Sequence, residues 1–220
     1  MGNRSVKEWC LRSAILFVGL IIAHLGVTLF LLTNLGSDPF NLFIQGLTRC
    51  VTTAGLSVAT HGYVHLSVSL LIIIVLLFTD KSYIKIGTLI CMLFGGPLID
   101  LFTLLIGPML ELCDALYVKL MLNAIGCALL AFGMSVVIKS DAGTGPNDLV
   151  GVVISDKLKV KFSVIRVIVD VSFILIGLLL GGTFGIGTLI CALLVGPVAG
   201  FFFPFVERWI GAVVRALVNM

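Results

Sequence analysis

Charged residues are scarce in this chain. Only 11% of its 220 residues are Asp, Glu, Lys or Arg, whereas 60% are apolar and the mean hydropathy is +1.23. Soluble domains carry about 25% charged residues, so these values exclude a water-soluble globular fold, a disordered chain and a coiled coil. The net charge is only +3, and the basic residues stand in short clusters between apolar stretches. We therefore expect a lipid bilayer, and no nucleic acid, as the main partner.

Catalytic and metal-binding patterns are also lacking. The sequence contains no HExxH, no GxxxxGK[ST] loop and no Ser/His, Cys/His or paired-carboxylate constellation. Its six cysteines form no C-x-x-C pair, although Cys50 and Cys113 fall on the expected outer side of the membrane, where a disulfide is permitted. His61 and His65 are one helical turn apart, but two ligands do not make a metal site. The sequence predicts neither an enzyme nor a bound cofactor or metal.

Long apolar stretches dominate what is present. A hydrocarbon layer of roughly 30 Å takes about 20 helical residues to cross. Because these stretches do not alternate as barrel strands do, they predict helices, which satisfy their own backbone groups in lipid. The fold class predicted is an all-α polytopic membrane protein. Its six expected spans are residues 13–32, 62–78, 86–106, 117–138, 162–180 and 186–206.

The basic residues between these spans indicate which way the chain faces. With six crossings, most of them fall on one side, and Arg49 and Lys119 fall on the other. Positive charge collects on the cytoplasmic side of membrane proteins, so both termini are expected there. The basic residues on the expected cytoplasmic side are Arg4, Lys7, Arg12, Lys81, Lys85, Lys139, Lys157, Lys159, Lys161, Arg208 and Arg215.

The two halves of the chain resemble each other. Residues 86–102 and 186–202 are identical at ten of 17 positions, and residues 36–42 resemble residues 143–149 in the same order. Three spans per half is an odd number, so the repeats are expected to be inverted. Inverted repeats are frequent in transporters and channels with a site near the midplane, although duplication can also give a merely structural protein. The expected units are residues 1–110, residues 111–206 and a C-terminal interfacial amphipathic helix at 207–220.

Each half also contains a Gly/Pro-rich polar element, at residues 35–57 and 141–161. Proline suits the first turn of a helix, so Pro39 and Pro146 predict two short helices. If these helices are re-entrant, their N-terminal N–H groups would attract an anionic or carbonyl-bearing solute. The alternative is a pair of interfacial helices that Asp38 and Asp148 simply cap.

Charged and polar groups inside spans are the remaining candidates, because they usually face a cavity or a partner. Arg166 and Asp170 are four residues apart and can pair, either as a structural ion pair or around a solute. Asp100 is alone in its span, where it could carry a proton, pair with Arg166 or reach the outer interface. Interhelical hydrogen bonds are expected from His24, Thr28, Asn123 and Ser135. The candidate solute-binding residues are Asp38, Asn41, Asp100, Asn147, Asp148, Arg166 and Asp170.

The elements at residues 36–41 and 143–148, the Arg166–Asp170 pair and the two Ile-Gly-Thr-Leu blocks together resemble the YczE-like branch of the YczE/YyaS/YitT integral membrane proteins of bacteria. The first element departs from the Gly-x-Gly-Pro-x-Asp pattern, with Asp38 for the second glycine and Asn41 for the acidic residue. The resemblance implies a multi-pass protein of the bacterial cytoplasmic membrane.

These features favour a transporter or channel for a small polar or anionic solute, with a site near the membrane midplane. One alternative is a substrate-binding membrane subunit that needs an ATPase partner. Another is a non-transporting accessory protein for membrane-associated biosynthetic enzymes. A homo-oligomer is compatible with each of these hypotheses.

Overall fold

The computed structural model of the chain describes residues 5–56, 58–110, 115–160 and 162–218. All regular elements in this part are helices, as the sequence predicts. Cys113, and with it the disulfide considered for Cys50, lies outside the described residues. The elements are α1 (Val6–Thr33), α2 (Pro39–Thr53), α3 (His61–Thr79), the 3-10 turn η1 (Lys81–Tyr83), α4 (Ile86–Leu110), α5 (Leu116–Ser140), α6 (Pro146–Leu158), α7 (Phe162–Leu179) and α8 (Ile186–Val218).

Five helices, α1, α3, α4, α5 and α8, are long and apolar enough to cross a membrane. Each coincides with an expected span. The sixth expected span corresponds to α7, which is not one of the five. Its 18 residues reach about 27 Å at 1.5 Å per residue, and it carries Arg166 and Asp170. Large apolar side chains, such as Phe78 and Leu179, are almost fully exposed on the outer faces, which fits a bilayer environment.

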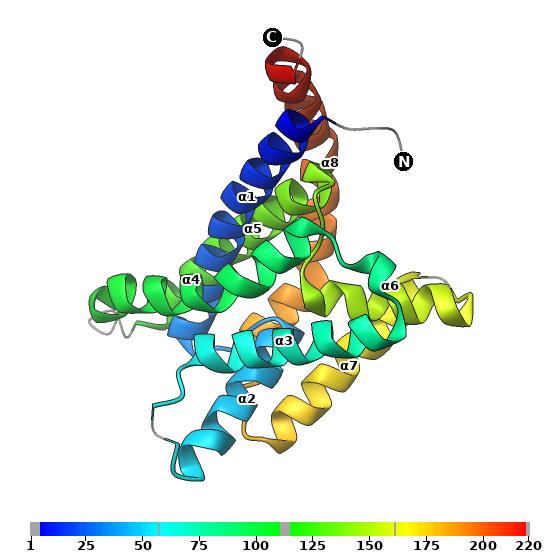
Figure 1. Cartoon of the computed structure of the whole chain (residues 1–220). Helices are drawn as coiled ribbons and strands as arrows, with labels where there is room; N and C mark the ends of the chain where they lie inside the picture. Colours follow the sequence, from blue (N-terminus) through cyan, green and yellow to red (C-terminus); the bar gives the residue numbers. More distant parts are fainter. Residues whose placement is uncertain (1–4, 57, 111–114, 161, 219–220) are drawn as a thin grey trace.

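Helices α1 and α5 pack against each other and run antiparallel, with α8 beside α5 (Figure 1). Glycines allow the α1 and α5 backbones to touch. A Cβ atom placed on Gly26 would lie 2.6 Å from the carbonyl oxygen of Gly126, and one on Gly133 would lie 2.6 Å from that of Gly19. Fully buried Phe30 packs into the same core. Close approach through small residues is the usual basis of helix packing in membranes.

Helix α8 is continuous from Ile186 to Val218, so the boundary expected at residue 207 falls inside it. The physical reason is packing, because Ile210 and Val214 are buried against Ile15 of α1. This extends the apolar face of α8 beyond Glu207. The start of α1 and the end of α8 therefore lie at the same end of the molecule (Figure 1).

Two glycine turns join α1 to α2 and α5 to α6, and each turn packs against the start of a distant helix. Gly36 and Gly143 have φ angles of +104° and +148°, which favour glycine over other residues. Just before each glycine, a carbonyl accepts a backbone hydrogen bond from the first turn of a long helix. Leu35 O accepts from Gly187 N of α8 at 2.8 Å, and Ala142 O accepts from Gly87 N of α4 at 3.0 Å. These bonds fix where α2 and α6 begin.

Candidate functional site

Both short helices begin at proline, as predicted. Asp38 caps α2, and its carboxylate accepts a hydrogen bond from Asn41 N at 3.2 Å. Gly145 stands at the cap position of α6 and offers no side chain. Asp148 is therefore not a cap, and its carboxylate is available for a different contact.

That contact is with Arg166 of α7. The Nη1 group of Arg166 donates to Oδ1 of Asp148, and its Nε donates to Oδ2 of Asp170 at 3.0 Å. The expected pairing of Arg166 with Asp170 is thus present, and Asp148 is the second carboxylate. The three side chains are only 22% to 30% exposed, so the guanidinium is held by two carboxylates in a mostly buried place. Asn147 donates to Oδ1 of Asp148 at 3.3 Å.

Asp38 is linked to this group only by longer-range electrostatics, because no direct contact with Arg166 or Asp170 is found among the described residues. Arg166 attracts the Asp38 carboxylate, and Asp170 repels it. The Asp38 carboxylate is oriented by the Asn41 amide, whose Nδ2 donates to Oδ2 at 2.8 Å. We call Asp38, Asp148, Arg166 and Asp170 the charged cluster. With three carboxylates and one guanidinium, it has a formal charge of −2 when all groups are ionised.

His61 extends this cluster toward α3. Its Nε2 lies 3.0 Å from Oδ1 of Asn41, so the ring and the Asp38 carboxylate are joined through one amide. The one-turn spacing of His61 and His65 in the sequence suggests only a pair of metal ligands. Among the residues that the structure describes, no three His, Cys, Asp or Glu side chains are grouped so as to hold a metal ion. The Asn41 contact could not be found from spacing, because 20 residues separate the two side chains.

Asp100 lies apart from the charged cluster. Its carboxylate accepts hydrogen bonds from the Thr60 hydroxyl and from Gly62 N, the latter at 2.9 Å, and so holds the N-terminus of α3. These partners lie on α3, and no Asp100–Arg166 contact is found among the described residues. Gly62 permits this arrangement, since a Cβ there would collide with Asp100 and with the Gly96 carbonyl.

The other polar residues in the spans divide into two groups. Asn123 donates from α5 to Thr33 of α1 at 2.8 Å, and Ser135 reaches Ala199 O of α8 at 3.3 Å, as expected. Thr28 instead donates to His24 O in its own helix, and His24 contacts Leu20 O at 2.9 Å. The prediction of interhelical bonds is therefore wrong for these hydrogen bonds of His24 and Thr28, which bind carbonyls one turn earlier in the same helix.

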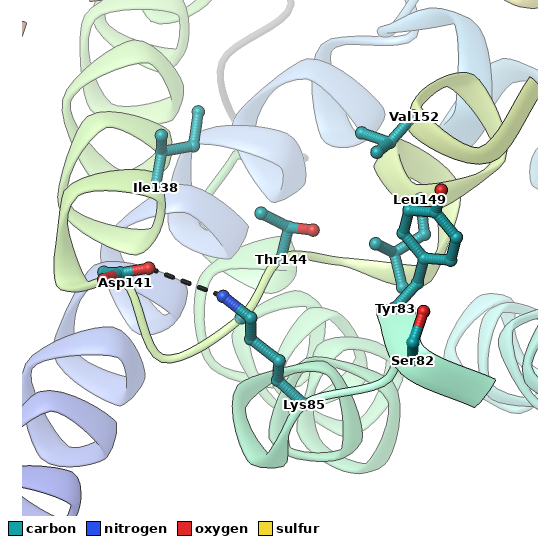
Figure 2. Close-up of a pocket in the computed structure, with 9 residues that line it drawn as sticks. Ser82, Tyr83, Lys85, Ile138, Asp141, Thr144, Leu149 and Val152 are labelled. Atoms are coloured by element: carbon teal, nitrogen blue, oxygen red, sulfur yellow. Dashed lines mark hydrogen bonds and ion pairs between the residues drawn. The ribbon is translucent and has the colours of Figure 1, made fainter. Parts of the chain in front are cut away.

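Two hollows lie beside α6. One, of about 240 Å³, is bordered by the η1 turn and the Gly143 turn, with Lys85 3.5 Å from Asp141 across it (Figure 2). Near it, the Tyr83 hydroxyl donates to Asp156 at 2.8 Å, and this bond raises the pKa of the phenol. The other is an almost wholly apolar groove of about 590 Å³ between α3 and α6, with Lys157 among the lining residues.

The fold and the site define the class: a multi-pass, all-helical membrane protein with a mostly buried charged cluster where its short helices begin. The family described as "Family of unknown function (DUF6198)" matches residues 10–204, and the chain belongs to this family.

Three relatives agree with this assignment. The chain is 31% identical to "Uncharacterized protein YyaS" of Bacillus subtilis (strain 168), over 87% of this chain and 92% of the relative. It is 28% identical to "Uncharacterized membrane protein YczE" of the same strain, over 90% and 88% of the two chains. It is also 28% identical to an "Uncharacterized protein" of Haemophilus influenzae, over 89% and 84%. The resemblance to YczE- and YyaS-like proteins is thereby confirmed. No solved structure matches the chain.

Proposed function

We propose that this protein is a transporter or channel for a small polar solute, which binds at the charged cluster near the membrane midplane. The observation that carries the proposal is the position of Arg166, which joins α6 to α7 through Asp148 and Asp170 inside an otherwise apolar protein. Ionisable groups at membrane depth are costly and are usually found where a solute or ion passes. Transport therefore explains their presence better than catalysis.

The charge of the cluster limits which classes of solute can bind there. Two of the five N–H donors of Arg166 already bind carboxylates, and these carboxylates repel an anionic solute unless it displaces Asp148 or Asp170. A cationic or zwitterionic solute can instead place its positive group among the three carboxylates. A panel of solutes with each kind of charge separates these modes.

Six crossings with both termini cytoplasmic form part of the proposal. Five crossings would put the start of α1 and the end of α8 on opposite sides, yet Ile15 and Val214 belong to one buried cluster. A sixth crossing, by α7, would put both ends on the same side. The distribution of Lys and Arg supports a cytoplasmic location in a bacterial cell for that end.

Two inverted three-helix repeats also belong to the proposal. The glycine turns support them: Gly36 packs against the start of α8, and Gly143 packs in the same manner against the start of α4. A pair of half-units exchanged in this way is typical of proteins that alternate access to a midplane site.

Uptake into proteoliposomes tests transport. The purified protein is reconstituted and challenged with a panel of labelled anions, zwitterions and cations. We expect uptake of one class, and loss of that uptake in Arg166→Ala and Asp170→Asn. Glu8→Gln is the matched control, because Glu8 is also the i−4 or i+4 partner of an arginine, Arg12, but lies outside the cluster. No uptake of any class, or equal loss in the control, contradicts the proposal.

Cysteine labelling tests the orientation separately. Cys10 and Cys50 are free and exposed, one near the start of α1 and the other near the end of α2. A membrane-impermeant maleimide added outside intact cells should label Cys50, and Cys10 should react only after the cells are opened. Labelling of Cys10 in intact cells would contradict cytoplasmic termini.

A further inference from the structure

The three histidines of this chain lie together, although they belong to two helices. His24 is on α1, and His61 and His65 are on α3. The ring centroids of His24 and His65 are 5.9 Å apart, and His65 also packs edge-on against Phe40 of α2. No other histidine occurs in the sequence. The complete set of imidazoles thus occupies one region beside the charged cluster.

The hydrogen bonds indicate where the ring protons are. Leu20 O can only accept, so Nδ1 of His24 carries a hydrogen, and Nε2 of the neutral ring keeps a lone pair. Asn41 donates its amide to Asp38, which leaves its oxygen to accept from Nε2 of His61. Nδ1 of neutral His61 is then the atom that can take up a proton.

A buried ring nitrogen of His65 is a further indication of a binding site in this region. The residue is 6% exposed, and its Nδ1 is buried with no hydrogen-bond partner in the described part of the chain. A buried polar atom without a partner is uncommon and unfavourable. Both His65 and His24 border Gly95 of α4, where a Cβ atom would be 3.0 Å from Cε1 of His65 and 2.9 Å from Nε2 of His24. The absence of a side chain at Gly95 therefore allows both rings to pack closely against α4.

Two carboxylates lie close to His61 along hydrogen-bonded contacts and can balance an added positive charge. Asp38 reaches His61 through Asn41, and Asp100 binds Thr60 and Gly62, the neighbours of His61 in the chain. The titratable and charged groups nearest the histidines are the histidines themselves, Asp38 at the start of α2 and Asp100 on α4. Farther away are Arg166 and Asp170 on α7, which interact electrostatically with Asp38, and Asp148 on α6, which binds Arg166.

We propose that His24, His61 and His65 form a proton-binding site whose occupancy is coupled to solute binding at the charged cluster, an inference that rests on the proposed function. A proton from the aqueous side forms an N–H bond at an imidazole lone pair, and the same bond breaks when the proton leaves on the other side. An imidazolium at His61 attracts Asp38 through Asn41 and offsets the longer-range attraction between Asp38 and Arg166. This changes the electrostatic field in which Arg166 holds Asp148 and Asp170, the two partners that a solute would replace.

The proton site is tested by ¹⁵N NMR of histidine-labelled protein in nanodiscs, because three residues give three assignable rings. We expect at least one ring to change reversibly from imidazole to imidazolium between about pH 4 and 8. His61→Gln keeps an amide donor for Asn41 but cannot bind a proton, so it should shift the midpoints of the remaining rings by at least about 0.5 pH unit. Ser67→Ala, on the exposed face of α3, is the matched control and should leave them unchanged. Three rings that stay neutral throughout overturn the inference, whatever is transported.

Coupling is tested in the proteoliposome assay with and without a pH gradient. For one proton per solute, a gradient of about two units permits roughly 100-fold accumulation. We expect gradient-driven accumulation in the wild type and its loss in His61→Gln and His65→Phe, with Ser67→Ala unaffected. Uptake that depends on Arg166 but ignores the gradient overturns the coupling and leaves the proposed function standing. Rings that titrate in a protein that moves no solute contradict transport and, with it, the coupling.

Discussion

Replacing Asp170 by Asn is the sharpest test of how the charged cluster holds the protein together. The change keeps the shape of the side chain and removes one carboxylate from Arg166. At an effective dielectric constant of about 20, unit charges at the 3.0 Å between Nε of Arg166 and Oδ2 of Asp170 attract by roughly 5.5 kcal/mol. Desolvation and side-chain ordering offset most of this attraction.

The second carboxylate reduces the loss further. Removing one partner from a buried ion pair costs about 3–5 kcal/mol when the remaining charge is left alone. Arg166 keeps Asp148, and the side chains of Arg166 and Asp170 are 30% and 28% exposed. We therefore expect Asp170→Asn to lower the free energy of unfolding by about 1–2 kcal/mol, below the range for a fully orphaned charge.

The double variant Asp148→Asn/Asp170→Asn decides whether the carboxylates act as a unit. With both removed, Arg166 keeps only its longer-range attraction to Asp38, so the combined loss should exceed the sum of the single losses. Unfolding by SDS in mixed micelles, followed by far-UV circular dichroism, measures each value.

The control for this series is Glu207→Gln. It breaks the Lys139–Glu207 pair, in which Glu207 is 65% exposed, and should change stability by at most about 0.5 kcal/mol. An Asp170→Asn variant as stable as this control, or a double variant whose loss is simply additive, would refute the reasoning.

Two further predictions use other parts of the chain. Gly26→Val should destabilise the protein by about 1–3 kcal/mol, because the added Cβ meets the Gly126 backbone. Gly200→Ala should be neutral or slightly stabilising in the same unfolding assay, because no other helix or loop of the described chain comes within 4 Å of the added Cβ. The bond to Asp156 raises the pKa of Tyr83 above 10.0, so its stabilising contribution is present below about pH 10 and is lost as pH rises through the higher folded value. In ultraviolet titrations, Asp156→Asn should bring the phenol back toward 10.0; an unchanged titration curve would remove that bond as the cause.

Local sequence patterns predicted the helices well. Pro39 and Pro146 begin α2 and α6 as expected, because proline fits the first turn of a helix regardless of the fold around it. The pairing of Arg166 with Asp170 also follows from spacing along one helix. Such features depend on a few neighbouring residues, and therefore they can be predicted from a single sequence.

Contacts between helices could not be predicted from the sequence in this way. Asp148 meets Arg166 across 18 residues because α6 packs on α7, and Asp100 holds α3 because Gly62 admits it. Neither contact leaves a local pattern. The continuation of α8 past Glu207 likewise depends on where Ile15 lies. For the site, the sequence supplied the ionisable residues, and only the packing decided which of them meet.

The glycine turns connect this packing to movement at the site. Helix α2, which carries Asp38, begins at a turn that is bonded to α8, and α6, which carries Asp148, begins at a turn bonded to α4. Each short helix is therefore attached to a long helix from the other half of the chain. A tilt of α4 relative to α8 has to move Asp148 relative to Asp38 or break one of these bonds. Arg166 binds Asp148 and attracts Asp38 at longer range, so such a tilt changes the balance between these two interactions. Under the proposed function, this change would couple a relative motion of the two halves to binding or release of the solute.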